Sequence, residues 1–550
     1  MSTIIINKTE FFKLLGKKLS DKEIEEKISM MGVSVEDIRE NEFDLEVFPN
    51  RPDLLSTYGL ARFVSVFLGI SKKLKSYNAK KSDYIINVEN PIAEWPYTAT
   101  AVVKGLKLNN EKIKEIINIQ EKLSTTLLRN RKKGGIGIYP LDKIKFPVKF
   151  TAAFPDKINY KPLECNKILS ANEILKEHPI GKAYNHIVKD WKKLPLFIDS
   201  NNNIMSMPPI VNSHDMGKID ENTTNVFIES TGIDFKTINI ALNIIVSAIS
   251  DMGGEIYQTK LIYKNKTYYT PDFKPNEIKL NVDYVNKNLG LELKQKEVIS
   301  LLQKMSYNTK KLKNDIIILV PAYRYDIIHP IDLVEDIAIA YGFDNILPKI
   351  KPIATIGEES ESEILRRKIS NLLIGLKYLE VHPYNLINLE AQTNLMNVKL
   401  NCVKLANSLS QEYNSLRTWI LPSLINILKE NKHNEYPQNI FCSGSVFKYD
   451  NNKDTGIRED LYVSLLACHS SANFTEIKQI LDYLSNCFSF NYEIEEKEHG
   501  SFISGRSGVI IINKKEVGII GEINPKVLEN FGLEMPVAAL ELNLEELFCL

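Results

Sequence analysis

The sequence contains few cysteines, and they are spread along the chain. Six cysteines occur in 550 residues, and no two of them form a CxxC pair. This spacing excludes a zinc module built on paired cysteines and argues against a disulfide framework, and it is typical of a reducing compartment. The eight histidines do not show the spacing of metal ligands either.

Long apolar runs are also missing. The stretch IALNIIVSAI, residues 240–249, is short and is interrupted by Asn243 and Ser247, whereas a membrane-spanning helix needs about 20 predominantly apolar residues. The N-terminal stretch carries several lysines and an acid and lacks the apolar core of a secretory signal. We therefore expect a soluble, cytoplasmic protein that has no membrane partner.

An excess of charge of either sign is absent. Lys and Arg number 69, Asp and Glu number 69, and the formal net charge is zero. No global field attracts nucleic acid, so any such binding must come from a local patch. The basic run RNRKK at residues 129–133 is one candidate for contacts to phosphates, with a solvated loop as the alternative.

Turn signals and hydrophobic periodicity divide the chain into four regions of an α+β multidomain protein. We expect an α/β module over residues 1–80, an α+β domain over 84–265, a small winged-helix-like module over 270–350 and a largely antiparallel sheet domain over 355–550. In the first region, PNRPD predicts a turn, and Asp53 is expected to cap the following helix. In the second, a glycine turn is expected to follow the helix that contains RNRKK.

The stretch RYDIIHPIDLVEDIAIAYG, residues 324–342, is rich in acids. Four acids occur in eleven residues, namely Asp326, Asp332, Glu335 and Asp336. Proline suits the first position of a helix, because its missing N–H would be unpaired there anyway. Gly342 follows the last apolar residue, where a helix is typically closed. The pattern predicts a helix from about Pro330 to Tyr341.

Two faces separate on this predicted helix. Four apolar residues at helical spacing form a core stripe: Val334, Ile337, Ala338 and Tyr341. Asp332, Glu335 and Asp336 have the same spacing and are expected to point the opposite way. Converging carboxylates repel unless a cation joins them, and Mg²⁺ typically takes one or two carboxylates and keeps several waters. An acidic, solvated face that complements the helix dipole is the alternative.

Five motifs occur in a fixed order along the chain. They are FPNRPDLLSTYGLAR, SMPPIVNS with NVFIESTGID, YRYDIIHPIDLVEDIAIAYGFDNI, LRTWILPSLI, and GRSGVIIINKKEVGIIGEINPKVLENFGLEMPVAALEL. Together they resemble the beta subunit of phenylalanyl-tRNA synthetase in its shorter archaeal and eukaryotic form. The resemblance spans nearly the whole chain, and the fixed order makes it far more specific than any single motif.

The resemblance implies a partner, a cofactor and an activity. The family's beta chain pairs with a catalytic alpha chain as (αβ)₂, which charges tRNA(Phe) with phenylalanine in an ATP-dependent reaction. The second region becomes an editing domain that hydrolyses mischarged tyrosyl-tRNA(Phe). The family also binds Mg²⁺ at the acidic helix, which implies Asp326, Asp332, Glu335 and Asp336 as the metal residues here.

The resemblance places the editing site around SMPPIVNS and FIES. Ser206 and Ser213 are expected to form hydrogen bonds there, and Glu229 is expected to accept one from the tyrosine hydroxyl. Two departures from the family pattern stand out: Glu229 replaces an aspartate, and Pro140 in YPLD replaces another. A non-catalytic assembly subunit of the same complex, without editing activity, is therefore the alternative. A free-standing nucleic-acid-binding protein is disfavoured by the zero net charge and the acidic helix.

The fourth region resembles a class II synthetase domain that has lost catalysis. Active class II sites hold the ATP phosphate with an arginine that follows a motif strand. The matching stretch NIFCSGSVFKYDNN offers Lys448 and no Arg-x-Glu, while Arg458 and Glu459 come later, in an expected loop. We expect no adenylate formation in this domain, and we expect its sheet and helices to contact the alpha chain.

Overall fold

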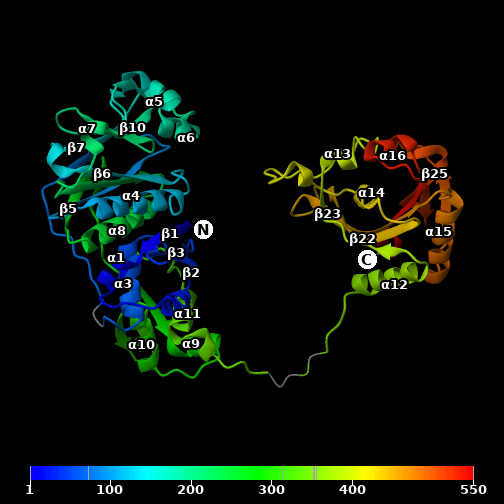
Figure 1. Ribbon diagram of the computed structural model, residues 1–550, viewed down its shortest axis with the longest axis horizontal. Helices are drawn as coiled ribbons and strands as arrows, with labels where there is room; N and C mark the ends of the chain where they lie inside the picture. Colours follow the sequence, from blue (N-terminus) through cyan, green and yellow to red (C-terminus); the bar gives the residue numbers. More distant parts are fainter. Residues whose placement is uncertain (1, 72–73, 314, 351–353, 355, 549–550) are drawn as a thin grey trace. The chain divides into compact units, whose positions relative to one another are not determined.

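The computed structural model describes residues 2–71, 74–313, 315–350, 354 and 356–548. The chain divides into two compact units, Met1–Ile350 and Lys351–Leu550, and both contain helices and sheets (Figure 1). This confirms the expected α+β multidomain class. Within the described ranges, no helix combines the length and apolar character needed to cross a bilayer. The boundaries of the four smaller regions stay predictions.

The N-terminal part of the first unit is a small antiparallel sheet with helices packed on it. Strands β1 (Ser2–Asn7), β3 (Glu42–Val47) and β2 (Ser34–Ile38) pair in the order β1-β3-β2. Helix α1 (Lys8–Leu15) packs on α3 (Thr57–Phe67), and the short α2 (Asp21–Glu23) continues into a π-helical turn at Ile24–Ile28. Buried and exposed residues alternate along β1, as expected for a strand with one core face.

The PNRPD motif does not supply the cap of α3. The side chain of Ser56 accepts the hydrogen bond from the backbone of Gly59, so the expectation for Asp53 was wrong. Asp53 instead forms a double hydrogen bond with Arg51, at 3.0 Å from Nε and 2.9 Å from Nη2. Both side chains are almost fully buried, and the guanidinium of Arg51 lies over the ring of Phe63.

A ten-stranded sheet forms the centre of the first unit. Its order is β12-β11-β10-β7-β4-β14-β5-β13-β6, and β15 pairs with β14. The strands are β4 (Ile85–Val88), β5 (Tyr97–Lys104), β6 (Gly134–Pro140), β7 (Val148–Ala153), β10 (Leu194–Ile198), β11 (Ile204–Met207), β12 (Val211–Asn212), β13 (Val226–Gly232), β14 (Glu255–Ile262) and β15 (Thr267–Thr270). Helices α4 (Asn110–Thr125) and α8 (Phe235–Asp251) pack together against its β5–β13–β6 end (Figure 1).

Further short elements surround the β10–β12 end of the sheet. They are β8 (Asn159–Tyr160), β9 (Leu169–Ser170), α5 (Ala171–Glu177), α6 (Pro179–Val188) and α7 (His214–Gly217). Apolar residues of α5, α6, β10 and the β11–β12 connection form one buried cluster. This cluster fixes the β11–β12 connection beside the central strands.

Strand β6 includes the glycines that the sequence predicted as a turn. Gly134–Pro140 pairs along its whole length with β13, and Gly137 lies opposite Glu229. Glycine in a strand interior often marks a close approach of other groups. A Cβ at Gly137 would lie 2.4 Å from the hydroxyl of Tyr139 and 2.5 Å from Oε1 of Glu229. The glycine thus makes room for the contact between these two side chains.

The last part of the first unit contains the acidic helix. Strands β16 (Asn276–Asn281), β18 (Asp315–Val320) and β17 (Asn308–Leu312) form a sheet in the order β16-β18-β17. The helices are α9 (Val282–Leu289), α10 (Gln295–Lys304) and α11 (Pro330–Tyr341). Helix α11 begins and ends at the predicted residues, with Pro330 in its first turn and a backbone bond from Gly342 to Ala338 closing it.

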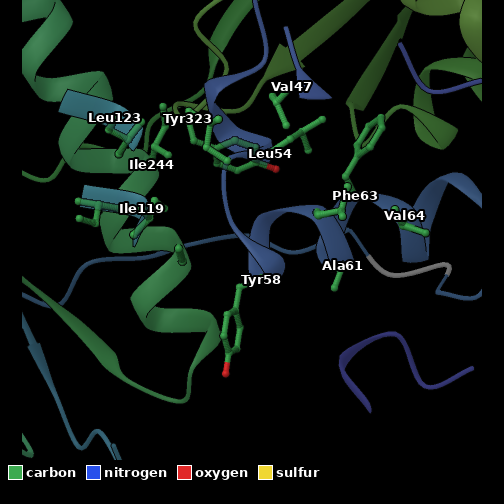
Figure 2. Packing of buried hydrophobic residues seen from close by; sticks show 14 of the residues in the cluster. Val47, Leu54, Tyr58, Ala61, Phe63, Val64, Ile119, Leu123, Ile244 and Tyr323 are labelled. Atoms are coloured by element: carbon green, nitrogen blue, oxygen red, sulfur yellow. The ribbon is translucent and has the colours of Figure 1, made fainter. Parts of the chain in front are cut away.

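One hydrophobic cluster runs through the three parts of the first unit. It contains residues from β1 and α3, from α4 and α8, and from β18 and α11. Figure 2 shows this packing around Leu54, Phe63, Ile119, Ile244 and Tyr323. The apolar faces of these segments cover one another, while two smaller clusters lie in the central sheet region.

The second unit is built on a seven-stranded sheet in the order β19-β22-β23-β27-β26-β25-β24. The strands are β19 (Leu379–Glu380), β22 (Gln438–Tyr449), β23 (Ile457–Cys468), β24 (Glu493–Glu496), β25 (Phe502–Ile512), β26 (Lys515–Ile523) and β27 (Val537–Asn543). Only β19 is parallel to its neighbour within this sheet. The expectation of a largely antiparallel sheet is therefore confirmed, including the β25–β26 hairpin.

Helices cover both faces of this sheet. One cluster combines α12 (Glu361–Gly375) and α15 (Phe474–Phe488) with one face, and a second combines α14 (Leu421–Glu430) and α16 (Pro525–Phe531) with the other. The remaining short elements are β20 (Leu386–Ile387), α13 (Leu389–Gln392), β21 (Ser415–Leu416) and α17 (Leu544–Phe548). Strand β27, at the centre of the sheet, is buried along its whole length, whereas the edge strand β24 is mostly exposed.

The buried Arg51–Asp53 pair generates a stability prediction. Replacing Asp53 with Asn should lower the free energy of unfolding by about 3–5 kcal/mol, because Arg51 would keep a buried charge without its partner. Glu111→Gln is the control, since its pair with Lys114 is about 60% exposed on both sides and exposed pairs contribute little. Denaturant unfolding of both variants measures the difference, and equal losses would contradict this role of Asp53.

Candidate functional site

A small cavity opens beside strands β6 and β13. Its volume is about 80 Å³. Its walls come from the glycine-containing part of β6, the end of α4, and the connection between β11 and β12, where the Pro208–Pro209 bond is cis. The residues that line it include Gln120, Arg131, Gly135, Pro209, Asn212 and Glu229.

Glu229 is the buried acid of this cavity. It is 2% exposed, and strand alternation puts it on the same face of β13 as Phe227 and Thr231. Its Oε1 accepts hydrogen bonds from the hydroxyls of Tyr139, at 2.9 Å, and Ser206, at 3.3 Å. Its Oε2 is buried and has no hydrogen-bond partner among the described residues. A buried polar atom left unpaired costs about 1–3 kcal/mol, so this oxygen favours a ligand that forms a hydrogen bond with it, as donor to the carboxylate or as acceptor from the carboxylic acid.

Burial also changes the protonation of Glu229. Loss of hydration raises its pKa to about 8, while the hydrogen bonds from Tyr139 and Ser206 act in the opposite direction. At neutral pH the carboxyl therefore carries a proton more often than not. Because its folded pKa lies above the usual value, its contribution favours the folded state at low pH and is lost as pH rises towards 8.

Arg131 forms another wall of the cavity. It donates from Nη1 to the backbone oxygens of Pro209, at 3.1 Å, and Ile210, at 2.7 Å, and lies over the ring of Tyr184. Three consecutive residues, 129–131, have positive φ angles of 50°, 52° and 63°, a region that costs energy outside glycine. This backbone turns Arg131 inward, while Arg129 and Lys132 of the basic run are exposed.

The structure brings together two of the three predicted editing residues. Ser206 and Glu229 are in direct contact. Ser213 is buried at the start of α7, where its backbone N–H donates to Met205, and it is not among the described residues that line the cavity. The predicted grouping of Ser213 with the other two is therefore not seen in the cavity.

Sequence reasoning missed Tyr139, Asn212 and Arg131. The signal for Tyr139 was strand alternation, because Tyr139 and Gly137 share the face of β6 that meets Glu229. Pro140 falls on the opposite face, and it pairs with Val226 at the end of β13. The departure from the family pattern at Pro140 therefore lies away from the carboxyl of Glu229.

The acids around α11 do not converge on one face. Asp336 is buried, and its carboxylate accepts from Nη2 of Arg324, at 2.9 Å, and from Tyr307. Asp326 pairs with the same guanidinium at 2.8 and 2.7 Å. The prediction that Asp336 points away from the core was wrong, because Arg324 supplies a buried positive partner.

Arg324 is the internal cation of this part of the fold. Its side chain is 2% exposed and lies 5.2 Å from the ring centre of Tyr307. Burial alone would lower the pKa of Arg324, but the charges of Asp336 and Asp326 hold it well above its usual range. The guanidinium therefore stays charged and pairs with two of the four acids.

The other two acids have different surroundings. Asp332 accepts from the backbone N–H groups of Ile328, at 2.8 Å, and His329, at 2.7 Å, and so caps the helix. Glu335 is exposed. Across the described ranges, no three His, Cys, Asp or Glu side chains are grouped to hold a metal ion. The four acids do not fit a site that binds one ion together, while Asp332 and Glu335 remain available for a hydrated ion.

The charged residues of the second unit form contacts within the fold. Lys448 donates to the hydroxyl of Tyr462, and Arg458 lies within β23 rather than in a loop and pairs with Asp460. Glu541 accepts from the backbone of Ile420 and Leu421 at the N-terminus of α14, at 3.0 and 2.9 Å. Burial raises the pKa of Glu541 to about 7. The carboxyl of Glu541 thus occupies the N-terminus of α14, a position that could otherwise bind a phosphate.

Comparison with known proteins gives consistent matches along the chain. The family described as phenylalanyl tRNA synthetase beta chain CLM domain matches residues 345–544, and the tRNA synthetase B5 domain matches residues 278–343. The chain is 39% identical to the phenylalanine–tRNA ligase beta subunit of Thermococcus sibiricus, over 99% of this chain and 98% of that protein. It is 37% identical to the beta subunit of Methanococcus aeolicus, over 99% and 100%.

A solved structure also matches the first unit. The crystal structure of an N-terminal fragment of the phenylalanyl-tRNA synthetase beta-subunit from Pyrococcus horikoshii has a TM-score of 0.60 and 36% identity. The match covers 62% of this chain and 99% of that fragment. Relatives of this similarity over nearly the whole length establish the family, so the chain belongs to the phenylalanine–tRNA ligase beta subunits.

Proposed function

We propose that this subunit hydrolyses tyrosyl-tRNA(Phe) at the cavity that contains Glu229. The buried, unpaired Oε2 of Glu229 supports this proposal. A hydrophobic pocket discriminates poorly against a ligand with an added hydroxyl. A site with a buried polar group that pairs with this hydroxyl strongly rejects a ligand without the hydroxyl. A tyrosine side chain would pair with Oε2, and a phenylalanine side chain would leave it unpaired. The correctly charged tRNA would therefore be spared.

The chain's own groups suggest how the site holds an aminoacyl ester. Ser206 contacts Glu229 and can orient its carboxyl, while the amide of Asn212 lies on the cavity wall and can bind the polar part of the ligand. Arg131 holds the Pro209–Ile210 backbone in place. In this arrangement the protein binds the side chain of the wrong amino acid and presents the ester to water.

We also propose that aminoacylation takes place on a partner alpha chain, within an (αβ)₂ assembly that binds tRNA(Phe). The names of the relatives support a subunit of this ligase. Two acids of the second unit are engaged within the fold, Asp460 by Arg458 and Glu541 by the backbone of α14. These pairings leave the sheet suited to a structural role beside the alpha chain.

Mg²⁺ remains a proposed cofactor, with a narrower set of residues. Arg324 pairs with Asp326 and Asp336, so Asp332 and Glu335 are the acids that would hold the ion. They stand three residues apart on α11, one turn of helix. Two carboxylates and several waters satisfy the usual coordination of Mg²⁺.

The editing proposal predicts different effects for its two serines. In the complex with the alpha chain, Glu229→Ala and Ser206→Ala should slow deacylation of tyrosyl-tRNA(Phe) by about 10- to 100-fold, the range expected for losing a hydrogen bond to a buried acid. Ser213→Ala should leave the rate unchanged. Single-turnover deacylation measures these rates, with charging of tRNA by phenylalanine as the control for intact assembly.

Two results would contradict the editing proposal. Deacylation by the unaltered complex at the rate measured without protein would favour the alternative of a non-catalytic assembly subunit. Equal losses for Ser206→Ala and Ser213→Ala would instead show that the cavity next to Glu229 is not the site.

The assembly proposal is tested by mass. Co-expressed with the alpha chain of the same ligase, this 62.8 kDa chain should elute as a complex with two copies of each chain. Light scattering after gel filtration measures the mass. A monomer that charges tRNA alone would contradict the division of labour.

The metal proposal separates the two pairs of acids. Replacing both Asp332 and Glu335 with Ala should weaken Mg²⁺ binding to the complex, because both proposed ligands are lost. Asp326→Asn should lower thermal stability, since it breaks the pair with Arg324, and should leave Mg²⁺ affinity unchanged. Calorimetric titration with MgCl₂ and thermal melts measure the two effects. A loss of Mg²⁺ binding in a stably folded Asp326→Asn variant would show that Asp326 is a ligand.

A further inference from the structure

The hydroxyl of Tyr139 contacts both Glu229 and Asn212, which line the cavity. The residue is fully buried, and its ring packs beside Phe227, with ring centres 6.1 Å apart. From this fixed position the side chain extends over Gly137, where a Cβ would lie 2.4 Å from the hydroxyl. The phenol therefore has one position, determined by the core on one side and by a glycine on the other.

The hydroxyl of Tyr139 has two neighbours that can accept a hydrogen bond. It lies 2.9 Å from Oε1 of Glu229 and 3.1 Å from Oδ1 of Asn212. A phenol has one proton, so it donates a hydrogen bond to only one of these two oxygens at a time. Through these contacts it links the two side chains. Asn212 and Glu229 both line the cavity, so Tyr139 connects the acid to the opposite wall.

We propose that Tyr139 is a positioning residue that engages Oε1 of Glu229, so that Oε2 is the oxygen presented to the hydroxyl of an aromatic ligand. The terminal torsion of a glutamate is broad and roughly two-fold, so a carboxyl without this contact turns more freely. With Oε1 bound to Tyr139 and Ser206, the carboxyl offers Oε2 alone to a ligand, in one direction. The inference rests on the proposed function for its substrate, and on the contact geometry for the role of Tyr139.

The test uses Tyr139→Phe, which removes one oxygen and keeps the ring. In the complex with the alpha chain, its deacylation of tyrosyl-tRNA(Phe) should fall about tenfold, the effect of one hydrogen bond, while its deacylation of phenylalanyl-tRNA(Phe) stays unchanged. Discrimination between the two substrates therefore falls by the same factor. The half-point of the pH–rate profile should also move upward, because the Tyr139 hydrogen bond lowers the pKa of Glu229.

Tyr263→Phe is the matched control. The hydroxyl of Tyr263 bonds to the backbone of Thr98, at 2.9 Å from its nitrogen and 3.1 Å from its oxygen. It is another largely enclosed tyrosine of the same unit, and among the described residues its hydroxyl forms hydrogen bonds with Thr98 and none with Glu229 or Asn212. A merely structural loss would affect the two variants alike, whereas the positioning role predicts an altered pH profile for Tyr139→Phe alone.

A second measurement keeps the inference separate from the editing activity. A protonated carboxyl gives an infrared carbonyl band, and the band that is absent from Glu229→Gln belongs to Glu229. Its pH dependence reports the titration of Glu229 without any substrate. In Tyr139→Phe this band should persist to higher pH than in the unaltered protein. If it titrates unchanged, the positioning role is overturned. If the titration shifts while no variant deacylates tyrosyl-tRNA(Phe), the proposed function fails and the role of Tyr139 towards Glu229 stands.

Discussion

The fold of the first unit depends on pairs of opposite buried charges, because a buried charge without a partner is strongly destabilising. Arg51, Arg62 and Arg324 lie around one small cavity, and each has an acid beside it. Arg62 pairs with Asp251, 189 residues away, while Arg51 and Arg324 pair with acids that are close in sequence. Each guanidinium also lies over an aromatic ring. These pairs fix the orientation of segments that the hydrophobic cluster alone would allow to slide.

Glu229 departs from this rule in an informative way. No arginine or lysine neutralises it among its described hydrogen-bond partners, and the acid instead meets hydroxyls. The protein thus keeps a buried carboxyl with one free oxygen, an arrangement that costs stability and is typical of functional sites. Glu541 is the contrasting case, because backbone N–H groups of α14 engage its carboxylate. One buried acid therefore keeps an unpaired oxygen, whereas backbone groups bind the other.

Local signals predicted the elements well and the site only in part. Pro330 and Gly342 fixed the ends of α11, and alternation revealed the hairpin of β25 and β26. Helical spacing did not predict that Asp336 points inward, because its direction depends on Arg324, which lies twelve residues upstream and outside the helix. Glycine propensity predicted a turn at residues that form β6. A glycine of this strand instead leaves room for the contact between Tyr139 and Glu229, which are 90 residues apart. Contacts of this kind exist only after the chain has folded.

The continuous core of the first unit also limits how the protein can be dissected. Apolar residues from β1 to α11 belong to one cluster, so a fragment that ended after α8 would expose the surfaces that β18 and α11 cover. A cut near residue 350 leaves this cluster intact, and the solved Pyrococcus horikoshii fragment corresponds to a similar N-terminal share of the chain. For expression, crystallisation or domain exchange, a fragment of residues 1–350 therefore keeps the Glu229 cavity together with this cluster.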